Sequence, residues 1–255
     1  MIPIRERFAS PDPRFVYLKT DDGSLTLEEV ATGNTFHSGC GAVAECAVVY
    51  AQNSQVAAGL AAGKPQRVLE LGFGTGLAFL VTASVAKRFG SFVEYVSFEQ
   101  RPLPLAIVKA VFNGARQIGP VDDALTELIV DQMERTTGSA GFARDATTVL
   151  QWEQIARLTV HGRDALGWRF DEDQVFDAIY FDPFDPVTNP KLWTLEFLSR
   201  MYQRLVPGGR MTSYCVKSDV RRRLMEAGFA VSKVPGPVGG KREVLVAERP
   251  TEDVG

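Results

Sequence analysis

The chain has 255 residues, 45% of them hydrophobic and 23% charged, and a formal net charge of −3. These values are ordinary for a soluble globular protein with a substantial buried core. The longest apolar run, residues 77–86, is too short to span a bilayer. Residues 1–14 carry charges and prolines, which excludes the apolar segment of a signal peptide.

Metal and disulfide chemistry are also disfavoured by the composition. The three cysteines are an odd number without a C-x-x-C pair, and the chain has only two histidines. This pattern argues against a zinc site and favours a reducing compartment. We therefore expect a cytoplasmic protein with no metal ion, no membrane partner and no obligate protein partner.

The N-terminal section precedes the regular part of the chain. Residues 15–18 and 24–27 are β-type runs joined through Asp22-Gly23, which predicts a hairpin. Residues 43–52 then predict an apolar helix that contains Glu45. We expect residues 1–60 to form a hairpin-and-helix appendage to a main domain at residues 61–250. The appendage covers the mouth of a cofactor site or simply caps the edge of the sheet.

A glycine-rich turn follows the first core strand. Residues 68–71 predict a buried strand, and residues 77–81 begin a helix. Between them the glycines have the spacing G-x-G-x-G, so the G-x-G-x-x-G of dinucleotide sites is absent. With Glu70 two positions ahead, the turn resembles motif I of class I S-adenosylmethionine (SAM) methyltransferases. The alternative is a glycine-rich connector that binds no ligand.

Acidic residues follow the next two strands of a regular βα alternation, which predicts a doubly wound parallel sheet. Glu99 ends the strand at residues 92–98, where a carboxylate is placed to accept both hydroxyls of a ribose. Asp164 follows the strand at residues 158–160 and is placed to accept a hydrogen bond from an adenine amino group. The alternatives are an ordinary surface acid at Glu99 and a turn residue at Asp164.

The strand at residues 175–181 runs into Asp182-Pro183-Phe184-Asp185-Pro186. In open α/β sheets the chemistry lies beyond the carboxyl ends of the strands, near the switch in strand order. We therefore expect Asp182 to face the methyl donor, and the prolines to stiffen the loop. The alternative is a helix cap or turn residue.

The remaining elements complete the sheet. Two helices are predicted within residues 101–135, the second of them acidic and without an evident purpose, and a polar loop at residues 136–146. A helix at 193–205, a strand at 210–216 and a helix at 219–227 follow. The final strands, 229–234 and 243–247, form an antiparallel hairpin, which distinguishes methyltransferases from dehydrogenases within the doubly wound class.

Positive charge is concentrated near the C-terminus. Residues 200–242 hold ten Lys and Arg against two acids, a local surplus of eight. Such a patch attracts phosphates although the whole chain is acidic, and aromatic side chains such as Phe184, Tyr214 or Trp193 are candidates to stack on a base. The alternatives are a solvated helix face and, for Trp193, a core aromatic.

Several segments together resemble the MnmC-type tRNA methyltransferases. They lie at residues 22–27, 36–38, 41–42, 70–80, 98–99, 102–103, 162–165, 182–193, 213–214, 220–222, 227–229 and 241–243. Asp182 with Asn189, Pro190 and Trp193, and the run Lys241-Arg242-Glu243, are the specific parts of this resemblance. Asp185 and Gly240 depart from the family pattern.

The resemblance implies a function and a site. The protein would methylate the 5-aminomethyl group of (2-thio)uridine at the wobble position of the tRNA anticodon loop, with SAM as donor and S-adenosylhomocysteine as product. It resembles the free-standing form of the family, without a flavin oxidase domain. The implied catalytic residues are Asp182 and Phe184. The implied cofactor residues are Glu70, Gly72, Phe73, Gly74, Gly76, Glu99, Asp164, Ala165 and Asp182, and the implied substrate residues are Asp185, Lys217, Arg221, Lys241 and Arg242.

Two other functions remain open on the sequence. One is a SAM-dependent methyltransferase that acts on a small amine or on another RNA position. The other is a protein of the same fold that binds without turnover. The presence of all four acids, Glu70, Glu99, Asp164 and Asp182, argues against this second function.

Overall fold

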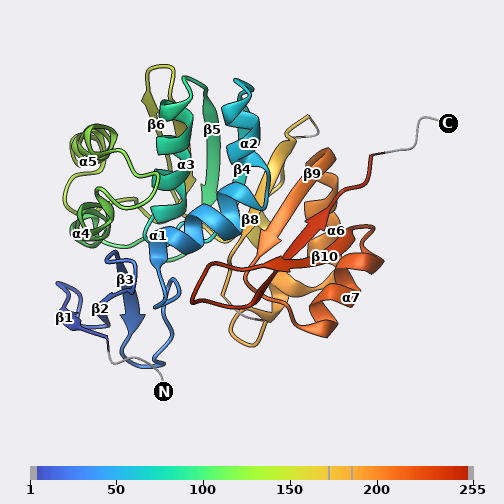
Figure 1. The fold of residues 1–255 in the computed structure, drawn as a ribbon, viewed down its shortest axis with the longest axis horizontal. Coiled ribbons are helices and arrows are strands. Elements are labelled where there is room, and N and C mark those ends of the chain that lie inside the picture. Colours follow the sequence, from blue (N-terminus) through green and yellow to red (C-terminus); the bar gives the residue numbers. More distant parts are fainter. Residues whose placement is uncertain (1–4, 172, 185, 252–255) are drawn as a thin grey trace.

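The computed structural model describes residues 5–171, 173–184 and 186–251. Within them an eight-stranded sheet has the order β10-β11-β9-β8-β4-β5-β7-β6 (Figure 1). Its strands are β4 (Gln66–Leu71), β5 (Val93–Phe98), β6 (Thr147–Trp152), β7 (Ala156–His161), β8 (Phe176–Phe181), β9 (Leu205–Ser213), β10 (Ala230–Pro235) and β11 (Glu243–Glu248). This is the predicted doubly wound class I methyltransferase sheet.

The strand directions place the switch point of the sheet at β4. Strands β5 and β8 flank β4 and run parallel to it, and β7 and β9 continue the parallel set on the two sides. Strand β11 lies antiparallel between β9 and β10, which confirms the predicted final hairpin. Strand β6, antiparallel to β7 at the other edge, was not predicted.

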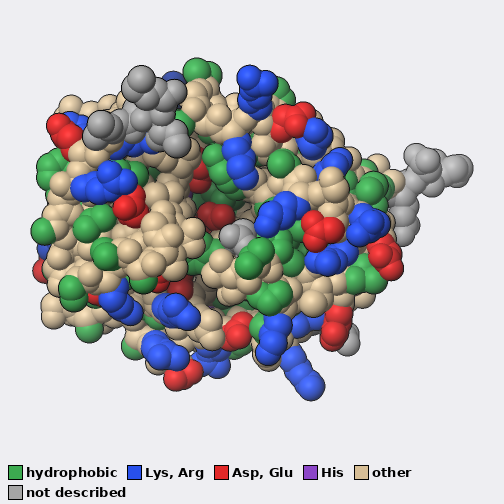
Figure 2. All heavy atoms as spheres, turned by 90° about the horizontal axis from the view of Figure 1, so that it is seen from below, with side chains coloured by type: hydrophobic (Ala, Val, Ile, Leu, Met, Phe, Trp, Pro, Cys, Tyr) green, Lys and Arg blue, Asp and Glu red, His purple; other side chains and the backbone are tan. Residues whose placement is uncertain are grey.

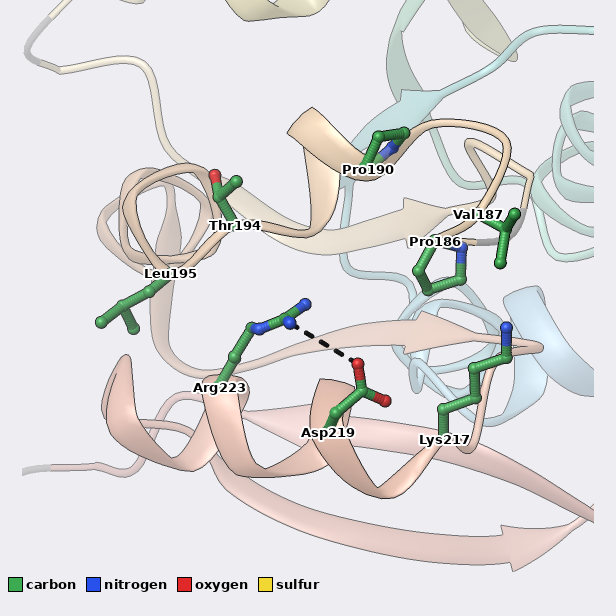
Figure 3. A pocket seen from close by; sticks show the side chains of 8 residues that line it. All are labelled: Pro186, Val187, Pro190, Thr194, Leu195, Lys217, Asp219 and Arg223. Atoms are coloured by element: carbon green, nitrogen blue, oxygen red, sulfur yellow. Dashed lines mark ion pairs between the residues drawn. The ribbon is translucent and has the colours of Figure 1, made fainter.

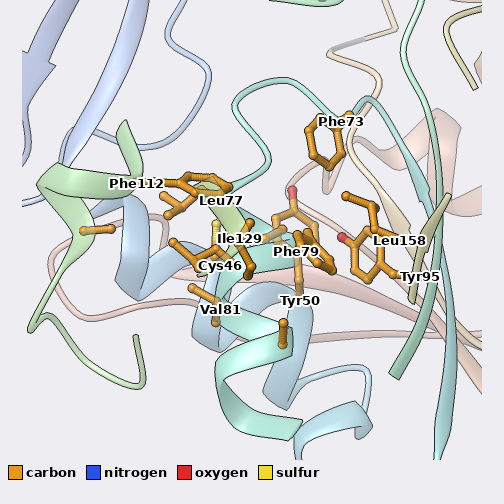
Figure 4. Close-up of a cluster of buried hydrophobic side chains, with 14 of the residues drawn as sticks. Cys46, Tyr50, Phe73, Leu77, Phe79, Val81, Tyr95, Phe112, Ile129 and Leu158 are labelled. Atoms are coloured by element: carbon orange, nitrogen blue, oxygen red, sulfur yellow. The ribbon is translucent and has the colours of Figure 1, made fainter. Parts of the chain in front are cut away.

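Alternating side chains along the strands build two cores. Val68 and Tyr95 belong to one core, whereas Leu69 and Val96 belong to the other. Helices α3 (Leu77–Arg88), α4 (Leu105–Ala115) and α5 (Asp123–Thr137) pack on the first face, part of which Figure 4 shows. Helices α6 (Leu195–Gln203) and α7 (Ser218–Glu226) cover the second face. Because helices cover both faces of the sheet, side chains on both sides of the central strands are buried. The sequences of these strands are therefore nearly continuous apolar runs.

The acidic helix α5 has a structural explanation. Glu127 lies 2.6 Å from Arg116, and Glu134 lies 2.8 Å from Lys109 on α4. Asp122, the N-cap of α5, lies 2.7 Å from Lys87 on α3 and accepts a hydrogen bond from Leu125 N. Part of the negative charge of this segment therefore pairs with the neighbouring helices.

Two predicted helices differ from the observed ones. The helix expected at residues 43–52 is a short α1 (Ala42–Glu45) followed by a π-helix, η1 (Cys46–Gln52), before α2 (Val56–Ala61). The helix expected at 193–205 is a 3₁₀ turn, η3 (Pro190–Trp193), followed by α6. Pro207-Gly208-Gly209 lies inside β9 and does not end a helix. Trp193 is 1% exposed, so it is the core aromatic that the alternative interpretation described.

The N-terminal section forms a separate small sheet of β1 (Arg7–Ala9), β2 (Phe15–Lys19) and β3 (Leu25–Glu29), in that order. The β2–β3 pairing confirms the predicted hairpin. Phe15 and Tyr17 belong to the same buried cluster as residues of α3 and α4, so this sheet is packed against the main one. The division at residue 60 stays a prediction.

Asp22 ties the hairpin to α1. Its carboxylate accepts hydrogen bonds from Ser24 N, Ser24 Oγ, Thr20 Oγ1 and Ala44 N, at 2.5–3.0 Å. Burial opposes ionisation here, but these hydrogen bonds outweigh it and hold the pKa of Asp22 below its usual value. The ionised carboxylate therefore stabilises the fold.

We expect Asp22→Ala to lower the free energy of unfolding by about 1–3 kcal/mol, because buried donors lose their acceptor. The folded-state pKa is depressed, so the contribution is full above the unfolded pKa near 4 and disappears as pH falls through the folded value. Urea unfolding at pH 7 and pH 3 measures this. A difference between wild type and variant that persists undiminished at pH 3 would contradict it.

Candidate active site

A cavity of about 650 Å³ opens at the carboxyl ends of the parallel strands. Residues that follow β4, β5, β7 and β8 line it, together with residues of the N-terminal section and of the loop between β10 and β11. Figure 2 views this side of the molecule: acidic side chains lie inside a hollow near the middle, and Lys and Arg side chains surround much of it. A hollow at the carboxyl ends of the strands, beside the point where the strand order reverses, is where open α/β sheets bind ligands.

The glycine turn forms one wall of the cavity. Gly72, Gly74 and Gly76 have φ of 97°, 52° and 75°, which favour glycine. A Cβ at Gly72 would lie 3.0 Å from the Asp182 carbonyl oxygen, and one at Gly74 would lie 3.2 Å from the ring of Phe36. The turn is therefore in close contact with both the β8 loop and the N-terminal section.

Gly76 has a different surrounding from the other two glycines. It is the N-cap of α3 and is absent from the cavity lining, and a Cβ there would lie 2.6 Å from the Phe73 ring. Phe73 is 4% exposed and lines the cavity. Gly76 therefore allows the packing of Phe73 against the start of the helix.

Glu70 lies at the floor of the cavity. It is 4% exposed and its Oε2 accepts a hydrogen bond of 2.9 Å from Ser97 Oγ on the neighbouring strand β5. Burial raises its pKa well above the usual value, and the Ser97 hydroxyl offsets this only in part. A carboxylate in this position is suited to a cationic ligand group, whose charge would favour its ionised form.

Glu99 anchors the turn to the next loop. Its Oε2 accepts a hydrogen bond of 2.8 Å from Gly74 N, and its Oε1 accepts one of 2.7 Å from Arg101 N. Burial raises the pKa of Glu99, and these two bonds oppose the rise. Each oxygen keeps a further lone pair for a ligand hydroxyl.

Asp164 and Ala165 lie at the end of the cavity beyond β7. Asp164 is exposed and accepts a hydrogen bond of 2.9 Å from Leu166 N, which starts the short 3₁₀ turn η2 (Ala165–Gly167). Ala165 is 7% exposed. Both residues line the same cavity as Glu70 and Glu99, so the acids after β4, β5 and β7 share one hollow.

Asp182 follows β8 and faces the same hollow. Desolvation raises its pKa to about 6, although the nearby Tyr50 hydroxyl and Lys241 ammonium both lower it. Phe184 has a left-handed φ of 54°, is 43% exposed, and lies 5.6 Å from the Phe36 ring in an edge-to-face contact. A strained non-glycine residue beside a cavity is typical of a functional loop.

The basic residues predicted to bind substrate divide into two groups. Lys217 and Lys241 line the cavity, and the Lys241 ammonium lies 4.3 Å from the centre of the Tyr214 ring. Arg221 and Arg242 lie outside the lining; Arg221 donates a hydrogen bond to Ser218 Oγ, and Arg242 is exposed. Asp185 lies outside the described residues.

Lys217 also lines a second hollow of about 580 Å³, next to the first (Figure 3). Its other lining residues include Pro186, Pro190 and Arg223, and an ion pair of 3.6 Å joins Arg223 to Asp219. The two hollows therefore share Lys217 as part of their linings.

Comparison with known proteins agrees with this geometry. Residues 135–250 match a family described as S-adenosyl-L-methionine-dependent methyltransferase. The chain is 31% identical over 219 residues (84% of the chain) to the tRNA 5-methylaminomethyl-2-thiouridine biosynthesis bifunctional protein MnmC of Stutzerimonas stutzeri, and 30% identical over 240 residues (92%) to that of Pseudomonas aeruginosa. It superposes on MnmC2 from Aquifex aeolicus with a TM-score of 0.71 and 25% identity, over 97% of this chain and 71% of that one.

The chain belongs to the MnmC methyltransferase family. It spans about a third of the length of these two bifunctional relatives, 32% and 35%. The absence of a flavin in this member stays a prediction. Among the described residues no cluster of three His, Cys, Asp or Glu is arranged to hold a metal ion, and no helix is long and apolar enough to cross a membrane.

The residues present fit SAM, the cofactor of the MnmC methyltransferase family. The lining of the cavity carries three acids at or after the ends of neighbouring strands: Glu70, Glu99 beside the glycine turn, and Asp164. Gly72 and Gly74, both with positive φ, present backbone to the cavity. When bound, SAM supplies a methyl group activated by its sulfonium.

Sequence reasoning missed several residues of this MnmC-family cavity. Glu45, Tyr50, Phe36 and His37 line it from the N-terminal section. His37 is 8% exposed, and burial lowers its pKa to about 4, so it is neutral at pH 7. The available signal was Glu45, a single charge inside an otherwise apolar helical stretch.

Proposed function

We propose that this protein transfers a methyl group from SAM to the primary amine of 5-aminomethyl-(2-thio)uridine at the tRNA wobble position. Membership of the MnmC methyltransferase family supports the proposal, because the matched relatives are named for biosynthesis of 5-methylaminomethyl-2-thiouridine. A tRNA substrate also implies that the protein acts in the cytoplasm.

One observation carries the proposal: Asp182 lies at the cavity immediately beside the glycine turn. Its carbonyl oxygen would be 3.0 Å from a Cβ at Gly72, and its side chain faces the cavity with a pKa of about 6. At neutral pH this carboxylate is ionised, so it can hold a cationic amine next to the cofactor. A free primary amine with a pKa near 10 arrives protonated and must lose a proton before it can attack.

The proposal extends to the cofactor residues, which share one cavity. Glu70 takes the cationic amino group of the methionine part, Glu99 the ribose hydroxyls, and Asp164 with Ala165 the adenine. Gly72, Phe73 and Gly74 provide the wall against which these parts lie, and Gly76 keeps Phe73 in place. These residues orient the donor, while Asp182 holds the amine and takes or relays its proton.

The tRNA contact is assigned to the rim. Phe184 lies half-exposed at the mouth and against Phe36, so an unstacked base has an aromatic surface beside Asp182. Lys217 and Lys241 at the cavity, with Arg221 and Arg242 further out, supply positive charge for phosphates.

Incubation with labelled SAM and tRNA that lacks only the final methyl group tests the proposal. We expect label in the wobble nucleoside, as 5-methylaminomethyl-(2-thio)uridine after digestion. Label at another RNA position, or only on free small amines, would support the alternative substrates instead. Absence of any transfer by a protein that binds SAM would identify a binding protein of the same fold.

Replacement of Lys217 and Arg221 by Ala should weaken tRNA binding and its dependence on salt. Each cation that neutralises a phosphate releases counterions, so removing two of them should reduce the slope of log K against log salt by roughly 1.5. Filter binding over a salt series measures this. The matched control is the double variant Lys64→Ala with Arg88→Ala, which removes two exposed cations outside the cavity lining. An equal change in the salt dependence of tRNA binding in both double variants would contradict a localised contact.

A further inference from the structure

A second acidic side chain faces the part of the cavity that holds Asp182. Glu45, at the end of α1, is 3% exposed and lines the cavity. Its Oε2 accepts a hydrogen bond of 3.0 Å from Ser38 N, and no described residue donates to Oε1. One carboxyl oxygen is therefore fixed by the backbone while the other is left for a ligand.

The Tyr50 hydroxyl lies in the same place, beside the Asp182 carboxylate. Tyr50 is 1% exposed and its hydroxyl is buried; it acts on Asp182 as a donor that lowers the pKa of that carboxyl, but the two groups are not within close hydrogen-bond geometry. Burial makes the largest contribution to the raised pKa of Tyr50. The Asp182 and Glu45 carboxylates raise this pKa further, so both lie near the hydroxyl. A buried hydroxyl that makes no close hydrogen bond is costly unless a ligand completes it.

The backbone explains how Tyr50 reaches this position. Tyr50 (Figure 4) lies on η1, the π-helix that follows α1. Its ring centre lies 5.3 Å from that of Tyr180 on β8. π-helical turns are rare and occur frequently at functional sites. Glu45 at the end of α1 and Tyr50 on η1 present two polar groups to one cavity.

We propose that Glu45 and Tyr50 complete, with Asp182, the binding site for the ammonium group of the acceptor, and that Glu45, in place of Asp182, takes the proton which this group must lose. The inference rests on the proposed amine methylation and extends it to the N-terminal section. That section thereby supplies part of the acceptor site as well as covering the cavity.

The charges around Glu45 agree with this role. Asp182 faces it from the β8 loop, Lys241 from the β10–β11 loop, and Cys46 and Tyr50 from η1; Tyr214 at the end of β9 also senses its charge. Burial, and then the Asp182 charge, raise the pKa of Glu45 to about 8, while Ser38 N and Lys241 lower it. At pH 7 the pair therefore carries about one negative charge, on Asp182.

The proton and electron changes balance. Binding of the ammonium group expels the Glu45 proton to solvent, so that two carboxylates surround one cation. The ammonium nitrogen then gives one proton to Glu45, the stronger base of the pair. The freed nitrogen lone pair forms the bond to the methyl carbon as the carbon–sulfur bond breaks and its electrons go to sulfur. The product is a secondary ammonium ion and a thioether, with Asp182 still ionised.

Binding of the nucleoside 5-aminomethyluridine to the protein loaded with S-adenosylhomocysteine tests the site without turnover. We expect the wild type to prefer it over 5-hydroxymethyluridine, a neutral analogue of similar size, and to release about one proton at pH 7. Calorimetry in buffers of different ionisation enthalpy measures that release. In Glu45→Gln the affinity should fall tenfold or more and the release should disappear, and Tyr50→Phe should weaken binding while the proton is still released.

The pH dependence of kcat/KM on aminomethyl tRNA provides the second readout. The wild-type profile should rise in two steps, near pH 6 and near pH 8, which belong to the coupled carboxyl pair. Glu45→Gln should lose the upper step and at least a hundredfold in kcat/KM. Glu28→Gln, an appendage carboxylate outside the cavity lining that pairs with Arg7, is the matched control and should behave as wild type.

The outcomes separate the inference from the proposed function. Unchanged nucleoside affinity and an unchanged pH profile in Glu45→Gln would overturn the inference while tRNA methylation stood. A wild type that shows no preference for the aminomethyl nucleoside would also overturn it. Conversely, Glu45-dependent proton release by a protein that does not methylate tRNA would support the ammonium site and refute the tRNA substrate.

Discussion

Asp182→Asn is expected to lower kcat for tRNA methylation by about 10²–10³-fold, the range for loss of one preorganised electrostatic contact to the reacting group. The amide is nearly isosteric but has no negative charge to hold the amine. Because Asp182 faces the cavity beside the turn rather than the adenine end, the Kd for SAM should change little. Single-turnover kinetics and calorimetry with SAM measure the two quantities separately.

The size of the effect on kcat is informative because alignment of the reactants remains in the variant. Orientation of the amine and the donor supplies up to about 7–11 kcal/mol, so Asp182→Asn should retain slow transfer. Asp173→Asn, at an exposed position before β8 and outside the cavity lining, is the matched control. Wild-type turnover by Asp182→Asn would remove Asp182 from the mechanism.

Glu99→Ala is expected to raise the Kd for SAM about a hundredfold. The variant loses the acceptor for the ribose hydroxyls and also the acceptor of Gly74 N and Arg101 N, which hold the glycine turn. Hydrogen bonds to a charged group contribute about 1.5–3 kcal/mol each, and each 1.4 kcal/mol is a tenfold change in Kd. Calorimetry and the stabilisation by SAM in thermal unfolding report the loss.

Glu94→Ala is the control for this substitution. Glu94 lies on the same strand, β5, but outside the cavity lining. Its variant should bind SAM as wild type does. If Glu99→Ala keeps the wild-type Kd, the ribose of SAM does not lie at Glu99, and the orientation of the cofactor assigned above is wrong.

The local signals in the sequence were sufficient for the cofactor half of the site. Glu70, Glu99 and Asp164 each follow a strand of a regular βα alternation, and parallel strands bring their carboxyl ends to one edge. Their convergence in one cavity therefore follows from chain order and strand direction.

The errors have a common cause. Strand β6 alternates weakly and pairs only at an edge, so its existence depends on β7 beside it. The π-helix η1 has the same apolar pattern as an α-helix, and its wider turn is visible only in the backbone hydrogen bonds. Local pattern carries no information about partners that are distant in the chain.

By itself the sequence determined the doubly wound sheet, the glycine turn and the acids that follow its strands, because each depends on residues within one βα unit. Only the tertiary structure decided that Glu45 and Tyr50 face Asp182, more than 130 positions later in the chain. Their ionisation depends on burial and on neighbouring charges, which exist only once the N-terminal section packs against the cavity.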